Sequence, residues 1–269
     1  MQRKILAAAL FASLPLVASA QSSVTIYGIA DAAIAREDTD GPEGSRTVIN
    51  SGNQSSSRIG FRGTEDLSGG LKAMFNLEAG VSLDTGNGDA ALFGRRAVVG
   101  LEGGFGLVTI GREYTPIASI AGQSDILGQG FYGTNLAAFN TGRLTRRLSN
   151  SINYKSNAMS GFKLLAAYGL GETSTGPSGD TAGVALEYAN GPLFVGAGYH
   201  QVERLASGDD KEYTVGAGYK FGMVEVKGNY MVADRTGANN KFEQLNLGAA
   251  VAVGSAGKVY VNLQRNEQA

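Results

Sequence analysis

The chain has 269 residues and a formal net charge of −1, with 23 basic and 24 acidic residues, so its charge gives no argument for nucleic-acid binding. It contains no cysteine, which excludes disulfides and thiol chemistry. After the amino-terminal segment, no stretch approaches about 20 uninterrupted apolar residues, which excludes a transmembrane helix. If the chain crosses a membrane, it must do so as a closed β-barrel, which leaves no backbone group unpaired in lipid.

The first twenty residues predict a cleaved signal peptide. Arg3 and Lys4 form a basic segment, residues 5–17 are apolar, and Ala18-Ser19-Ala20 is a small-residue cleavage site. We therefore expect residues 1–20 to be removed on export and residues 21–269 to form the mature domain.

The mature chain repeats a period-two alternation of polar and apolar residues. In 58–62, Arg58 and Arg62 alternate with Ile59 and Phe61, and 71–78 continues the pattern after a short turn. Successive side chains of a strand point to opposite faces, so each such segment is a strand with one polar face. The pattern predicts thirteen strands, near 24–36, 54–63, 70–81, 93–102, 105–112, 146–156, 161–170, 181–189, 193–202, 211–220, 223–232, 242–253 and 257–264.

The connections between these strands alternate between short and long. The short ones are 64–69, 103–104, 157–160, 190–192, 221–222 and 254–256, and the long polar ones are 37–53, 82–92, 113–145, 171–180, 203–210 and 233–241. This alternation is typical of an up-and-down barrel in an outer membrane. The apolar face would then contact lipid, and the polar face, with Tyr27, Asp31, Lys72, Asn76 and Glu78, would line the lumen.

Two other kinds of protein remain compatible with the sequence. A soluble, exported β-sandwich that acts as a binding module shows the same alternation of faces. A barrel enzyme would need a nucleophile, a base and an orienting acid near one rim, and the sequence shows no such set. His200, the only histidine, has no nucleophile motif beside it and is interpreted as a wall residue. No motif predicts a metal or cofactor.

One connection, 113–145, is far longer than the usual loop and contains apolar residues that need a surface to pack on. A loop folded back into the barrel would satisfy this need. Near it lies an excess of arginines, with only Glu113 and Asp125 as acids in the loop. Arginine stays charged and pairs with anionic groups, and a ring of charge selects ions of opposite sign. The candidate pore-lining residues are Arg58, Arg62, Arg95, Arg143, Arg147, Glu113 and Asp125; the sides faced by Arg96 and Arg112 stay open.

Four blocks carry a resemblance to a known family: 22–34 (SSVTIYGIADAAI), 56–78 (SSRIGFRGTEDLSGGLKAMFNLE), 94–116 (GRRAVVGLEGGFGLVTIGREYTP) and 146–154 (RRLSNSINY). Together they resemble the general diffusion porins of β-proteobacteria. The resemblance implies a sixteen-stranded outer-membrane barrel, a homotrimer in contact with lipid and lipopolysaccharide, through which small hydrophilic solutes diffuse passively. It also implies that the third loop folds inward and that Arg58, Arg95 and Arg147 line the constriction.

The sequence departs from this family at two places. Gly94 and Arg96 stand where relatives often have Asn and Gln. Thirteen strands are visible where the family has sixteen and ends in a terminal Phe, so we expect a carboxy-terminally truncated barrel. From the arginine excess we expect a modest preference for anions.

Overall fold

The computed structural model describes residues 23–38, 41–42, 44–130, 135–174, 179–204, 208–236, 240–255 and 257–268. The predicted signal peptide lies outside these residues.

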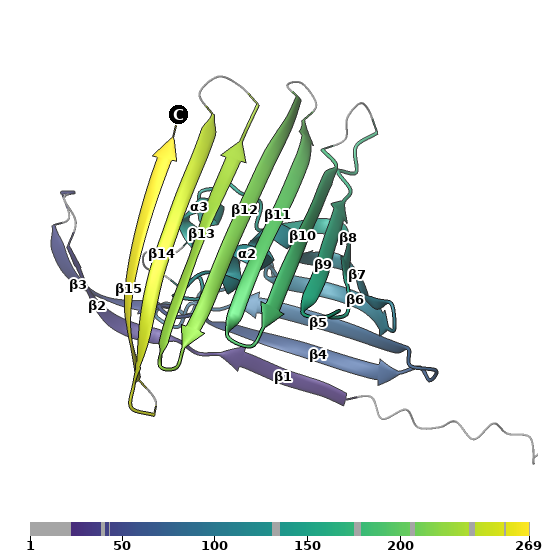
Figure 1. Ribbon diagram of the computed structural model, residues 1–269, viewed down its shortest axis with the longest axis horizontal. Helices are drawn as coiled ribbons and strands as arrows, with labels where there is room; N and C mark the ends of the chain where they lie inside the picture. Colours follow the sequence, from purple (N-terminus) through teal and green to yellow (C-terminus); the bar gives the residue numbers. More distant parts are fainter. Residues whose placement is uncertain are drawn as a thin grey trace, which may run out of the picture.

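Thirteen strands form one antiparallel sheet in the order β1-β4-β5-β6-β7-β8-β9-β10-β11-β12-β13-β14-β15, so chain neighbours pair throughout except between β1 and β4. The sheet curves into a trough, and the short helices of the described chain lie in it (Figure 1). Its edge strands are β1 and β15. The predicted all-β, antiparallel class is confirmed.

The strand bounds are Ser23–Ile29 (β1), Arg58–Asp66 (β4), Lys72–Gly80 (β5), Arg96–Gly103 (β6), Gly106–Tyr114 (β7), Arg147–Lys155 (β8), Phe162–Gly169 (β9), Thr181–Asn190 (β10), Leu193–Arg204 (β11), Gly208–Phe221 (β12), Val224–Asp234 (β13), Lys241–Val253 (β14) and Gly257–Gln268 (β15).

The first predicted strand, 24–36, is wrong in one respect, because the chain leaves the large sheet after Ile29. Ala32–Asp38 (β2) pairs instead with Ser45–Ser51 (β3), inside the segment expected to be a polar connection. Asp31 lies at the point of departure. Its carboxylate accepts hydrogen bonds from the backbone N–H groups of Asn53, Gln54 and Ser55, at 3.1, 2.8 and 2.8 Å. This contact closes the β2–β3 hairpin at its base.

The two faces of the sheet differ as the alternation predicts. The convex face carries large exposed apolar side chains, including Val99, Ile110, Ile152, Leu186 and Leu247. Residues of the opposite parity are buried on the concave face and are mostly polar, including Asn76, Glu78, Glu187, Glu212 and Asn246. An apolar exterior around a polar interior is the reverse of a water-soluble sandwich and fits a sheet that faces lipid.

The third loop, defined here as residues 115–146, follows β7. Its described parts, 115–130 and 135–146, lie in the trough and contain α2 (Pro116–Gln123) and α3 (Leu136–Asn140). Thr115 caps α2, since its Oγ1 accepts from Ala118 N at 3.2 Å and donates to Thr145 O at 2.7 Å. The buried apolar core lies between this loop and the sheet, with Ile117, Leu136 and Phe139 on the loop and Met231 and Phe242 on the wall. Among the described residues, no helix is long and apolar enough to span a membrane.

Glycines on the concave face make room for the loop. A Cβ on Gly248 would lie 2.7 Å from Ile126 Cβ, and a Cβ on Gly196 would lie 2.5 Å from Ile120 Cδ1. Real Cβ atoms do not approach other atoms so closely, so larger residues at these wall positions would push the loop away.

Candidate functional site

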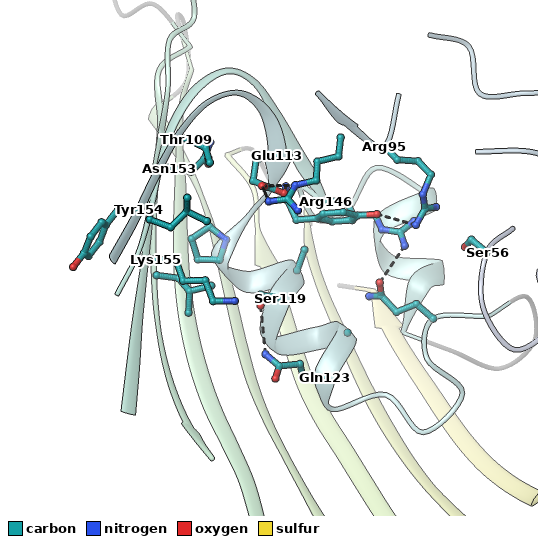
Figure 2. Close-up of a pocket in the computed structure, with 18 of the residues that line it drawn as sticks. Ser56, Arg95, Thr109, Glu113, Ser119, Gln123, Arg146, Asn153, Tyr154 and Lys155 are labelled. Carbon is teal, nitrogen blue, oxygen red and sulfur yellow. Dashed lines mark hydrogen bonds and ion pairs between the residues drawn. The ribbon is translucent and has the colours of Figure 1, made fainter. Parts of the chain in front are cut away.

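A cavity of about 390 Å³ lies between the third loop and the concave faces of the strands around β7 and β8. Figure 2 shows polar side chains from both the loop and the wall around it, whereas Tyr154 points away. Its lining includes Arg58, Arg95, Arg96, Arg146, Glu113 and Tyr114. Four guanidinium groups therefore border one space.

Glu78 of β5 forms ion pairs with two arginines, Arg95 and Arg58. Arg95 Nε lies 2.7 Å from Glu78 Oε1, and Arg58 Nε lies 3.6 Å from Glu78 Oε2. The Tyr27 hydroxyl lies 2.9 Å from the same Oε2 and 3.0 Å from Asn76 Oδ1. One carboxylate thus faces two guanidinium groups, which leaves a net positive charge.

Arg96 and Arg112 take opposite sides of the wall. Arg96 forms an ion pair with Glu113 (its Nε lies 2.7 Å from Oε2), which places Arg96 on the concave face. Arg112 lies two residues after exposed Ile110 in β7 and therefore on the same, convex face. Its Nη1 donates to Ser149 Oγ at 2.8 Å. The β7–β8 register shifts between Gly111 and Glu113, and a shift of this kind can re-aim a side chain.

Tyr114 ends β7 and accepts hydrogen bonds from two guanidinium groups. Arg95 Nη2 lies 3.0 Å and Arg147 Nη2 lies 2.9 Å from its hydroxyl oxygen. Arg147 Cζ is also 4.6 Å from the centre of the ring, and Arg146 Cζ is 5.8 Å from it. Both distances suit cation–π contacts. Three cations therefore gather around one neutral side chain.

Arg146 and Arg147 lack a compensating acid. Arg146 Nη2 donates to Gln129 Oε1 at 3.1 Å, and within the described part of the chain neither arginine forms an ion pair with a carboxylate. Burial lowers the pKa of Arg146 to about 10, so its guanidinium stays charged at neutral pH. Four arginines and Glu113 line the cavity. Directly behind this lining, Glu78 pairs with Arg95 and Arg58, and Arg147 bonds to Tyr114, so two acids face five arginines in this region.

The remaining predicted residues lie elsewhere. Arg62 Cζ is 5.1 Å from the centre of the Tyr27 ring, on the same face as Arg58. Arg143 Cζ lies 5.9 Å from the Phe242 ring, in the third loop. Asp125 is only 1% exposed inside the loop, where it accepts from Leu127 N and Asn135 N at 2.8 Å each, and burial raises its pKa. Lys72 is exposed at the start of β5.

Two buried wall carboxylates hold the third loop in place. Glu187 of β10 accepts from Ser119 Oγ at 2.8 Å and from Gln123 Nε2 at 2.5 Å. Glu212 of β12 accepts from Thr145 N at 2.9 Å and from Thr145 Oγ1 at 2.7 Å, and it lies 3.0 Å from His200 Nδ1.

Sequence reasoning missed these anchors and Tyr114. Glu187 and Glu212 could have been found from the sequence, because each is an acid at a strand position that the alternation assigns to the concave face, which the loop contacts. His200, expected to be a wall residue, is fully buried beside Glu212.

Comparison with known proteins agrees with this architecture. Residues 6–269 match the Gram-negative porin family. The chain is 34% identical to outer membrane porin protein 32 of Delftia acidovorans, over 96% of this chain and 78% of that protein. It is 32% identical to an outer membrane porin protein of Bordetella pertussis, over 84% of this chain and 68% of the relative.

Solved structures show the same likeness. An anion-selective porin from Comamonas acidovorans superposes with a TM-score of 0.81 at 32% identity, over 92% of this chain and 80% of that one. OmpF of Salmonella typhi, at 17% identity, shares the fold with a TM-score of 0.71 over 91% of this chain and 79% of that one.

The family match covers almost the whole chain and the similar proteins are porins, which are channels rather than enzymes, so the chain belongs to the Gram-negative porin family of the bacterial outer membrane.

Proposed function

We propose that the chain forms a water-filled channel through which small hydrophilic solutes and ions diffuse passively, with a modest preference for anions. The observation that carries this proposal is the unbalanced charge beside the third loop. Arg146 and Arg147 have only neutral acceptors among the described residues, Gln129 and Tyr114. A wall with excess positive charge attracts anions and repels cations. The similar Comamonas acidovorans protein is described as an anion-selective porin, which supports the same preference here.

The constriction in this proposal is formed by Arg58, Arg95 and Arg147 on the wall side, with Glu113 as the nearby acid. Arg62, beside Tyr27, and Arg143, beside Phe242, supply further positive charge. Asp125 contributes through the shape of the loop, because its carboxylate is buried and bonded to backbone N–H groups. Tyr27, Asn76 and Glu78 belong to the lumen wall.

We also propose a homotrimer in contact with outer-membrane lipid and lipopolysaccharide, as the family resemblance implies. Chemical cross-linking in mild detergent tests the assembly. A ladder that ends at three copies supports it, and a monomer at every cross-linker concentration contradicts it.

The channel proposal is tested by the reversal potential of the refolded protein in a planar bilayer under a KCl gradient. We expect stepwise conductance with a reversal potential displaced toward that of chloride. Arg58→Glu should shift it toward potassium, because the substitution replaces a positive charge with a negative one beside Glu78. A reversal potential on the potassium side for the unmodified protein would contradict the anion preference, and an absence of steps would contradict channel formation.

A further inference from the structure

We propose that Tyr114 is a positioning residue that sets the ion selectivity of this channel by fixing Arg147 and Arg95 around one neutral oxygen. The proposal rests on the anion preference inferred above and adds the residue that maintains it. The family resemblance implied roles for arginines only and gave none to this tyrosine.

The contacts of Arg147 make it dependent on Tyr114. Its only described side-chain hydrogen bond runs from Nη2 to the Tyr114 hydroxyl, at 2.9 Å, and its Nε is buried without a partner among the described residues. The guanidinium also lies over the Tyr114 ring, with Cζ at 4.6 Å from the centre. No acid in the described part of the chain pairs with it. Without Tyr114, Arg147 would lose both of the contacts that define its position.

Arg95 differs from Arg147 in this respect. Without the tyrosine hydroxyl, Arg95 keeps its ion pair with Glu78, whose Oε1 lies 2.7 Å from its Nε, whereas Arg147 keeps only its contact with the aromatic ring. Like charges at short range repel each other, and the hydroxyl oxygen offsets this repulsion by accepting from both groups. Removal of that oxygen should therefore displace mainly Arg147 from its place beside Tyr114.

A neutral acceptor holds the arginines without cancelling their positive charge. A carboxylate at this position would hold the arginines equally well, but it would cancel one positive charge. The phenol orders the cations and leaves their charge available to an ion in the channel. Tyr114 is itself held in place, since its N–H donates to Glu113 Oε1 at 2.9 Å and its side chain packs against the core under the third loop.

The test compares Tyr114→Phe, Arg147→Gln and the double variant with the unmodified protein. Phenylalanine keeps the ring and its packing, and removes only the shared oxygen. We expect Tyr114→Phe to lower the chloride-to-potassium permeability ratio about twofold, the effect of moving a unit charge from about 5 to about 10 Å from an ion in water. In the Arg147→Gln background, Tyr114→Phe should cause no further change. Tyr154→Phe is the matched control, because the Tyr154 hydroxyl bonds to Phe105 O outside the cavity.

Two readouts separate failure of this inference from failure of the proposed function. If the unmodified protein prefers anions and Tyr114→Phe leaves the ratio unchanged, the positioning role is wrong. An equal loss in the Arg147→Gln background would also overturn it, because the tyrosine would then act by another route. Open-channel current noise does not depend on the sign of selectivity, and a mobile Arg147 should raise it in Tyr114→Phe. Even if the unmodified channel shows no anion preference, unchanged noise would contradict the positioning role.

Discussion

Glu212 is expected to hold the carboxy-terminal end of the third loop against the wall. Its carboxylate is nearly fully buried and receives two hydrogen bonds from Thr145, in addition to its contact with His200. Glu212→Ala removes all of these acceptors and leaves the Thr145 N–H and the His200 ring without partners. Hydrogen bonds to a charged group contribute about 1.5–3 kcal/mol each, and such contributions are not additive when the bonds share one group.

We therefore expect the free energy of detaching residues 141–146 from the wall to fall by about 3 kcal/mol. Since about 1.4 kcal/mol corresponds to a factor of ten, the detached state should become about two orders of magnitude more populated. Hydrogen exchange at the Thr145 amide, measured in detergent, reports this population directly. Single-channel recordings should also show added closures or sublevels, because the loop borders the cavity.

A matched control is Glu243→Ala, which removes a carboxylate that pairs with exposed Lys241 on the convex face. This variant should leave both exchange at Thr145 and the channel record unchanged. If Glu212→Ala exchanges at Thr145 as slowly as the unmodified protein, the third loop is held by its apolar core and the anchoring argument is wrong.

Three further substitutions test other parts of the account. Glu78→Gln should raise the chloride-to-potassium permeability ratio, measured from bilayer reversal potentials, about twofold. The reason is that a unit charge about 8 Å from an ion in water changes the energy of that ion by about 0.5 kcal/mol. A shift toward potassium would contradict the inferred excess of positive charge at the cavity. Gly248→Val should displace Ile126 and thereby change single-channel conductance, whereas Gly104→Val, in a turn where a Cβ meets open space, should not. Asp31→Ala should speed hydrogen exchange at Asn53, Gln54 and Ser55, which lose their acceptor, and unchanged exchange there would contradict its role as the clamp of the β2–β3 hairpin.

Period-two alternation was enough to predict the large sheet and its faces, because successive side chains of a strand point alternately to the convex and the concave side. The strands predicted near 181–189 and 242–253 appear as β10 and β14 with the expected faces. The prediction was wrong after Ile29, where the chain leaves the large sheet and Asp31 bonds to the backbone of residues 53–55. The contacts of Asp31 lie more than twenty residues ahead in the sequence, so no local pattern reveals that β1 ends at Ile29.

The arrangement of the arginines depends on similar long-range contacts. Parity alone would place Arg95 and Arg96 on opposite faces, yet both bond to acids on the concave face, Glu78 and Glu113. Arg95 precedes the first residue of β6, where the alternation does not yet apply. Tyr114 looks in the sequence like any aromatic residue at a strand end. Its contacts become visible only when the end of β7 is brought together with the starts of β6 and β8.

We attribute the channel's preference for anions to Arg146 and Arg147, which have no acid partner among the described residues. The most direct test is the reversal potential of the Arg146→Gln/Arg147→Gln double variant beside the unmodified protein, under the same KCl gradient. Arg204→Gln is the control, because Arg204 is already paired with Asp210 at the end of β11. We predict an anion-selective unmodified channel, a double variant that loses most of this preference, and an unchanged control. A double variant as anion-selective as the unmodified protein would contradict the account.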